Sequence, residues 1–195
     1  MERVGERPNL WAALARVKAN GGSPGPDGMT SEELPGDRQP HWPALRAALL
    51  AGPSRPQPVK RVELPKSGGG VRKLGMPPVL DRFLPQALLQ GWQPAWDRTF
   101  ADGSYGFRPG RSAPQALARA QAYLEEGYSW VVDLDLEKFF ARVNQDKLMS
   151  LVKGRIRDRR VVQWIDRYLK AGALTGDGCE ATPEGTPPGG PLAPL

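Results

Sequence analysis

Two carboxylates and two phenylalanines lie close together in the segment SWVVDLDLEKFFARVN, residues 129–144. With the two-residue period of a β-strand, Asp133 and Asp135 share one face, about 7 Å apart, and apolar side chains such as Trp130 share the other. Two acids at this spacing repel each other unless a cation or a basic partner lies between them. The segment therefore indicates either an edge strand with one hydrated face or a divalent-metal site, whose oxygen ligands suit Mg²⁺ carrying nucleotide phosphates.

A second set of charged residues flanks a glycine-rich turn. The stretches VKRVELPK and VRKLGMP alternate with a strand period and are joined by SGGG, which predicts a β-hairpin with a mobile tip. Lys66 and Arg72 lie on its two arms, and further basic residues crowd its base. Taken alone, these residues favour a hydrated basic loop over an anion-binding one.

The composition narrows the class of protein. The 195 residues suffice for one domain of ordinary size or for part of a larger one. Lys and Arg total 27 against 21 acidic residues, and the isoelectric point of about 9.7 favours a polyanionic partner. A single cysteine, Cys179, and a single histidine, His41, exclude an internal disulfide framework, a zinc site and a Ser/His triad. With no membrane-length apolar run and no signal-peptide core, a soluble cytoplasmic protein is expected.

The apolar period predicts the elements that must position these residues. Helices are expected over residues 9–19, 42–52, 80–96, 113–126, 145–154 and 159–171. Pro85 and Pro94 are expected to kink or divide the third of them. Ser112, with Gln115 three residues later, predicts a capping box at the start of the fourth. The acidic strand follows that helix, so its apolar face is expected to lie on the core.

Four segments, in this order, resemble the reverse transcriptases encoded by group II introns, the maturase family. They are PVKRVELPKSGGGVRKLGMPPVLDRFLPQALL, SYGFRPGRSA, VVDLDLEKFFARVNQDKLM and EGTPPGGPLAPL, and the resemblance extends from about residue 24 to residue 195. It implies an α+β fold with right-hand polymerase-like fingers and an incomplete palm, in which helices pack on a small antiparallel sheet. It also implies an N-terminal extension and start of the fingers over 1–57, fingers with the basic hairpin over 58–115, and a partial palm over 116–195.

The resemblance assigns roles around the acidic strand. It implies that Asp135 is a catalytic carboxylate that binds two Mg²⁺ ions, with the backbone carbonyl of Leu136 beside the metal. Asp133 is either a second ligand or a structural carboxylate paired with an arginine. Phe140 matches the steric gate, where a flat ring leaves no room for a 2′-hydroxyl and so selects deoxynucleotides. Phe139 is expected to pack in the core.

The resemblance also implies the partners, namely an RNA template or intron RNA, a DNA primer and a deoxynucleoside triphosphate. Lys66 and Arg72 match the residues that grip the triphosphate. Five further cations are expected to meet template or primer phosphates without sequence choice: Arg61, Lys73, Arg82, Arg108 and Arg111. Tyr105 and Phe107 either stack on bases or pack under their loop, and the sequence does not separate these two outcomes.

The sequence departs from the family pattern at three positions. Ala141 replaces an aspartate, Gln145 replaces a histidine, and Pro188 replaces a glutamine. The family's second catalytic motif, Tyr-Ala-Asp-Asp, is expected beyond the terminal loop, so a truncated form is expected. Two hypotheses follow: an RNA-directed DNA polymerase with a maturase role in intron splicing and mobility, or a non-catalytic RNA-binding remnant or non-functional fragment of one.

Overall fold

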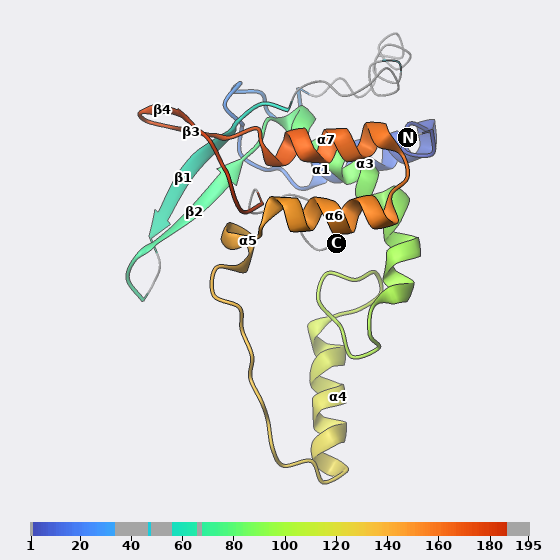
Figure 1. Ribbon diagram of the computed structural model, residues 1–195. Coiled ribbons are helices and arrows are strands. Elements are labelled where there is room, and N and C mark those ends of the chain that lie inside the picture. The colour runs from blue at the N-terminus through green and yellow to red at the C-terminus, as the bar shows by residue number, and fades with distance from the viewer. Residues whose placement is uncertain (1, 34–46, 48–55, 66–67, 187–195) are drawn as a thin grey trace.

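The computed structural model describes residues 2–33, 47, 56–65 and 68–186. Its body is a group of four helices, α1 (Arg7–Ala19), α3 (Val79–Trp96), α6 (Gln145–Arg155) and α7 (Arg159–Leu169), with a small sheet at one end (Figure 1). Helix α4 (Ala113–Glu125) extends away from this body, and the chain returns to it through a long segment without regular structure. Two short elements, the 3₁₀-helix η2 (Asp97–Thr99) and the one-turn helix α5 (Phe139–Arg142), complete the helical part.

The core forms where α1 lies against α3. The buried residues of α1 are Leu10, Ala13, Leu14 and Val17, which follow the helical period and place one apolar stripe on the partner helix. The Asn9 side-chain amide reinforces this packing, because it donates to the carbonyls of Val4 at 2.9 Å and Ala87 at 3.0 Å. The helix expected over 9–19 is therefore confirmed, with its start two residues earlier.

Helix α3 runs without interruption from Val79 to Trp96, although Pro85 and Pro94 lie inside it. Each proline lacks the N–H that would bond to the carbonyl four residues earlier. The burial of Phe83, Leu84 and Leu88 in the common core keeps the helix continuous, so of the two expected outcomes, a kink or a division, the division does not occur.

Helices α6 and α7 supply the other half of the core. Trp164 is fully buried and stacks on Tyr168 with 5.1 Å between ring centroids. Both helices begin with a side-chain cap. The side-chain oxygen Oδ1 of Asn144 accepts from Lys147 N, and the Asp158 carboxylate accepts from Arg160 N. These two helices were predicted from the sequence, and both are confirmed.

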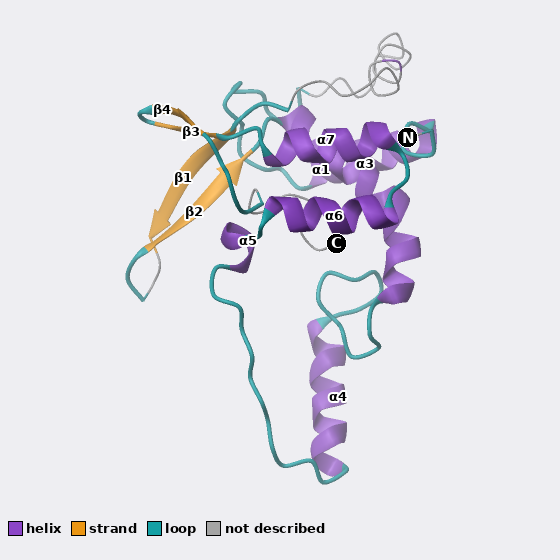
Figure 2. Ribbon diagram, viewed as in Figure 1, coloured by secondary structure: helices purple, strands orange, loops and turns teal. Residues whose placement is uncertain are grey.

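The sheet is mixed rather than purely antiparallel. Strands β1 (Val59–Pro65) and β2 (Val71–Met76) form the predicted hairpin, and β3 (Ala173–Thr175) with β4 (Gly178–Glu180) forms a second one. The strand order is β2-β1-β3-β4, and β1 and β3 run parallel, so segments more than 100 residues apart meet in one sheet (Figure 2). The expectation of a purely antiparallel sheet is therefore wrong for the β1–β3 pair, which forms because the second hairpin adds to the first.

The expected strand over residues 129–136 is not part of this sheet. The segment is extended, but among the described residues no strand pairs with it, and its side chains lie in solvent. Trp130 is 94% exposed and Leu134 is 87% exposed, so the apolar face that was expected to lie on the core is uncovered. Apolar and acidic residues do alternate in this segment, but a β-strand also needs a neighbouring strand that pairs with its N–H and C=O groups.

Two expectations fall on residues outside the described part. The helix expected over 42–52 lies outside the described residues, except for residue 47. Lys66 also lies outside them. Within the described residues, no helix combines the length and the apolar character that crossing a membrane requires.

Candidate nucleotide and nucleic-acid site

The two predicted metal carboxylates lie on the extended segment that joins α4 to α5. Asp133 and Asp135 are both exposed, and they keep the alternate spacing seen in the sequence. In the part of the chain that the structure describes, no group of three or more His, Cys, Asp or Glu side chains is arranged to hold a metal ion.

A tight turn follows the carboxylates and sets the orientation of the two phenylalanines. The Leu136 carbonyl accepts the Phe139 N–H at 3.2 Å, and Lys138 adopts a left-handed conformation with φ of 53°. Since a carbonyl oxygen has two lone pairs, one remains for a further partner. Phe139 and Phe140 then meet edge to face, with 5.6 Å between their centroids.

This turn is bonded to the loop that begins the last motif. Thr186 N donates to the Phe140 carbonyl at 2.7 Å, and Gly185 N donates to the Val143 carbonyl at 2.8 Å. The approach is so close that a Cβ atom on Gly185 would lie 2.8 Å from the carbonyl oxygen of Ala141, and its φ of 80° also favours glycine. Two motifs about 45 residues apart are thereby brought into direct contact.

Gln145 also binds this loop, a role that the sequence did not reveal. Its buried side-chain amide donates to the carbonyls of Leu169 at 3.3 Å, Thr182 at 3.0 Å and Gly185 at 3.0 Å. The family pattern marked Gln145 only as a departure from histidine. The one available signal was its place directly after the Asn144 cap, in the first turn of a helix.

Phe140 lies on the wall of an apolar cavity of about 440 Å³ at the junction of α3, α5, α6 and α7. The cavity is lined largely by aromatic and aliphatic side chains, among them Trp92, Trp96, Phe139, Phe140, Ile165 and Tyr168. Phe140 keeps 46% of its surface exposed, so its ring is only partly covered by these neighbours. The steric-gate role of Phe140 stays a prediction, while Phe139 is also half-exposed and not packed in the core as expected.

The basic hairpin places its cations on paired strands. Arg72 lies opposite Leu64, and Lys73 lies opposite Glu63, in the β1–β2 ladder. Arg61 forms an ion pair with Glu180 of β4, so part of its charge is already balanced within the sheet.

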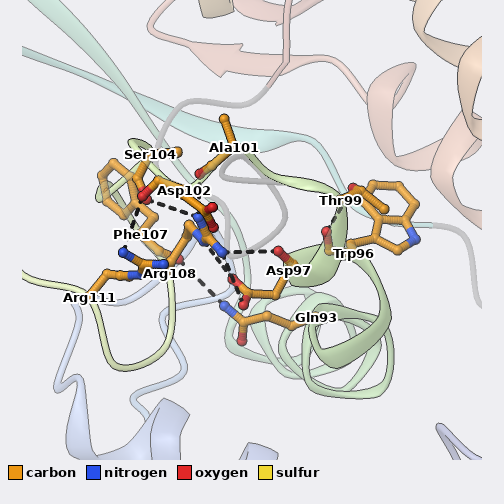
Figure 3. A network of polar contacts seen from close by, with 10 residues as sticks. All are labelled: Gln93, Trp96, Asp97, Thr99, Ala101, Asp102, Ser104, Phe107, Arg108 and Arg111. Carbon is orange, nitrogen blue, oxygen red and sulfur yellow. Dashed lines mark hydrogen bonds and ion pairs between the residues drawn. The ribbon is translucent and has the colours of Figure 1, made fainter.

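Arg108 lies at the centre of a polar network in the loop between α3 and α4 (Figure 3). Its Nε and one terminal nitrogen donate to the Asp97 carboxylate at 2.8 Å and 3.3 Å, and that terminal nitrogen also donates to the Asp97 carbonyl at 3.1 Å. The other terminal nitrogen donates to the carbonyls of Ala101 at 2.8 Å and Ser104 at 3.0 Å. A guanidinium has five N–H donors, and all five are used here.

This geometry bears on the interpretation of Arg108. In this arrangement the guanidinium of Arg108 bonds to Asp97, Ala101 and Ser104, and its predicted phosphate contact stays a prediction. The hydrogen bond from Arg108 also lowers the pKa of the Asp97 carboxyl, which therefore stays ionised. Arg82 is similarly engaged, since it donates to the backbone carbonyls of Pro77, at 3.0 Å, and Ser23.

Arg111 keeps more of its donors. It donates to the Asp102 carbonyl at 3.2 Å, and its guanidinium lies over the Tyr105 ring at 5.2 Å from the centroid. Tyr105 is thus half-covered, whereas Phe107 in the same loop is 84% exposed. The structure separates these two aromatic residues, which the sequence left equivalent.

The chain belongs to the reverse transcriptase (RNA-dependent DNA polymerase) family, whose model matches residues 64–195. This match includes the end of β1, the second strand of the hairpin, the carboxylate segment and the loop that Gln145 holds.

Among curated proteins, the chain is 34% identical to protein YkfC of Escherichia coli K12 over 99% of its own length and 52% of that protein. It is 30% identical to the group II intron-encoded protein LtrA of Lactococcus lactis subsp. cremoris, over 97% of its own length and 32% of that protein. The chain therefore spans about half the length of YkfC and a third of LtrA. Among solved structures, it is similar to a chain titled "Partial Cas6-RT-Cas1--Cas2 complex", with a TM-score of 0.58 and 24% identity over 98% of this chain and 32% of that one, which supports the fold.

Proposed function

We propose that this chain provides the fingers and the first part of the palm of an RNA-directed DNA polymerase of the group II intron type. Its partners in this proposal are a template or intron RNA, a DNA primer and a deoxynucleoside triphosphate. Lys66 and Arg72 of the hairpin bind the triphosphate, and Phe140 excludes a 2′-hydroxyl from the sugar position. Arg61, Lys73 and Arg111 meet nucleic-acid phosphates.

Reverse transcriptases as a family use divalent metal ions. Asp135, Asp133 and the Leu136 carbonyl are hard oxygen donors, and Mg²⁺ is usually held by one or two carboxylates together with waters and substrate phosphates, so the donors fit in kind. In our proposal Asp135 is the principal ligand of two Mg²⁺ ions. When bound, these ions lower the pKa of the primer 3′-hydroxyl and neutralise the leaving pyrophosphate.

The observation that carries this proposal is the contact between the two motifs. The carbonyls of Phe140 and Val143, shortly after Asp135 in the chain, accept from the N–H groups of Thr186 and Gly185, which supports a common site for these two motifs. The basic hairpin belongs to the same sheet as β3, because β1 pairs with β3. Strand β3 follows α7, and the Gln145 amide bonds to the carbonyl of Leu169 at the end of α7.

Primer extension on an RNA template with deoxynucleotides and Mg²⁺ tests the proposal. Extension that is reduced to background by Asp135→Asn, and is unchanged by Asp177→Asn in the exposed β3–β4 turn, is the expected result. Phe140→Ala is expected to admit ribonucleotides. Extension that survives Asp135→Asn would overturn the assigned role of this carboxylate.

A second candidate function is RNA binding without polymerisation. It is favoured by one observation, namely that Asp133 and Asp135 lie on a segment whose backbone has no strand partner among the described residues. Carboxylates on such a segment are not fixed relative to one another. An RNA mobility shift that weakens linearly with the logarithm of salt, without extension under any metal condition, would support this candidate.

A further inference from the structure

The starting observation is the conformation of Phe107. It has a φ of 54°, a left-handed value that is rare for a bulky side chain, and its ring is among the most exposed large apolar groups of the body and its loops. A strained conformation persists only where the surrounding structure fixes it, and such positions are enriched at ligand sites.

The surrounding structure does fix it. The five donors of Arg108, the next residue, hold Asp97, Ala101 and Ser104 around one guanidinium. The Gln93 amide of α3 donates to the Phe107 carbonyl at 3.5 Å, which ties the residue to the helix in the body (Figure 3). The ring of Phe107 is therefore presented on a pre-organised loop rather than on a free end.

The charge around this loop suits a polyanion. Residues 97–119 contain four arginines and two aspartates, and Arg108 is paired with Asp97. Arg98 is exposed, and Arg111 retains most of its donors beside the Tyr105 ring. An exposed aromatic ring flanked by cations is the combination that binds single-stranded nucleic acid, because every base offers a face for stacking and the phosphates meet the cations.

We propose that Phe107 is a stacking platform for one base of a single-stranded RNA, with Arg111 at the adjoining phosphate. This proposal rests on the proposed function and extends it by naming a contact for the unpaired template. Arg108 is the positioning residue, since it holds the loop.

A polypeptide partner is a less suitable ligand for the Phe107 ring than for the exposed segment 129–136. That segment has backbone groups available for an added strand, whereas several carbonyls of the loop already accept hydrogen bonds. The carbonyls of Ala101, Asp102, Ser104 and Phe107 all accept hydrogen bonds from side chains or backbone within the loop and α3. These bonds leave the loop fewer backbone groups for an added strand than segment 129–136 has, and an isolated exposed ring suits a flat base.

The test uses the full chain and a single-stranded RNA of about 12 nucleotides, within the range of site sizes known for such proteins. Binding is measured for Phe107→Ala, Phe107→Leu and Phe107→Trp, with Leu117→Ala of α4 as a control for an exposed apolar residue. Stacking predicts that Ala and Leu both weaken binding, roughly 5- to 100-fold, while Trp keeps or strengthens it. The salt dependence should stay the same, because no charge is changed.

The outcomes are distinguishable. If Phe107→Leu binds RNA as well as the unmodified chain does, the ring is an apolar contact for a polypeptide and the stacking role is overturned. Photo-crosslinking with 5-iodouridine RNA, followed by mass spectrometry, should place an adduct on Phe107, and an adduct only elsewhere would also overturn it. If the unmodified chain binds no RNA at any salt concentration, the proposed function itself fails. A fully double-stranded RNA should not respond to these substitutions, because its bases are already stacked.

Discussion

The Gln145 side-chain amide donates a hydrogen bond of 3.0 Å to the carbonyl of Gly185, 40 residues further along the chain. The same amide reaches two more carbonyls, so one buried side chain joins the start of α6, the end of α7 and the loop of the last motif. This loop is bonded in turn to the carbonyl of Phe140, the predicted sugar-selecting residue.

We expect Gln145→Leu to lower the free energy of unfolding by about 1–3 kcal/mol, because buried carbonyls lose their donor. Urea denaturation followed by circular dichroism measures the change. Gln121→Leu is a matched control, since Gln121 is exposed on α4 and bonds only to Glu125. Equal stability of the two variants would show that the amide does not hold the loop.

The Asp97–Arg108 pair is expected to make stability depend on acid pH. The hydrogen bond from Arg108 lowers the pKa of Asp97 below its ordinary 3.8, so the pair stabilises the fold fully above pH 3.8 and loses this effect as pH falls through the lowered value. The stability difference between the unmodified chain and Asp97→Asn should be constant from about pH 8 to 5 and shrink in acid. Thermal unfolding across pH measures it. In an Arg108→Gln background the difference should be small at every pH, and an undiminished difference there would exclude this pair as its source.

Trp164 offers a test of an unpaired polar group in the core. Its ring nitrogen is buried and has no hydrogen-bond partner within the described residues. Trp164→Ala is expected to cost about 3–5 kcal/mol by leaving a cavity. Trp164→Phe should cost under about 2 kcal/mol, because removing an unsatisfied N–H offsets part of the lost volume.

Chemical denaturation of the two Trp164 variants provides the comparison. The same two substitutions at Trp130, which is 94% exposed, should each stay within about 0.5 kcal/mol of the unmodified chain. A costly Trp164→Phe change would mean that the ring nitrogen is satisfied in solution.

The segment Val131–Asp135 is expected to exchange its amide hydrogens fast. Its N–H groups have no backbone acceptor among the described residues, whereas those of α7 lie in a buried helix. Hydrogen exchange followed by mass spectrometry should show at least roughly 10³-fold slower exchange in α7. Comparable protection in both would mean that a strand already pairs with the segment in solution.

The elements of the body could be predicted because each carries its own signal. The stripe Leu10, Ala13, Leu14 and Val17 gives α1, and the SGGG turn gives the β1–β2 hairpin, since both depend on residues close in sequence. The parallel junction of β1 with β3 could not be predicted, because three residues carry too weak a period and the pairing joins distant segments.

The candidate site was predictable in its residue types and less so in its geometry. The alternation around Asp133 and Asp135 predicted a half-buried strand, and the structure has none there, because strand pairing and burial depend on a neighbour that the pattern itself does not contain. Arg108 shows the opposite case. Its charge suggested a nucleic-acid contact, whereas only the three-dimensional arrangement reveals that every donor is spent within the loop.

The uncovered surface of α4 and its following segment has a consequence for the life of the protein in a cell. Leu117, Trp130 and Leu134 are exposed apolar side chains, and holdase chaperones bind such side chains on newly made polypeptides. Quality-control proteases compete for the same surface. Shielding of these side chains by another surface is therefore expected to raise the cellular abundance of this protein.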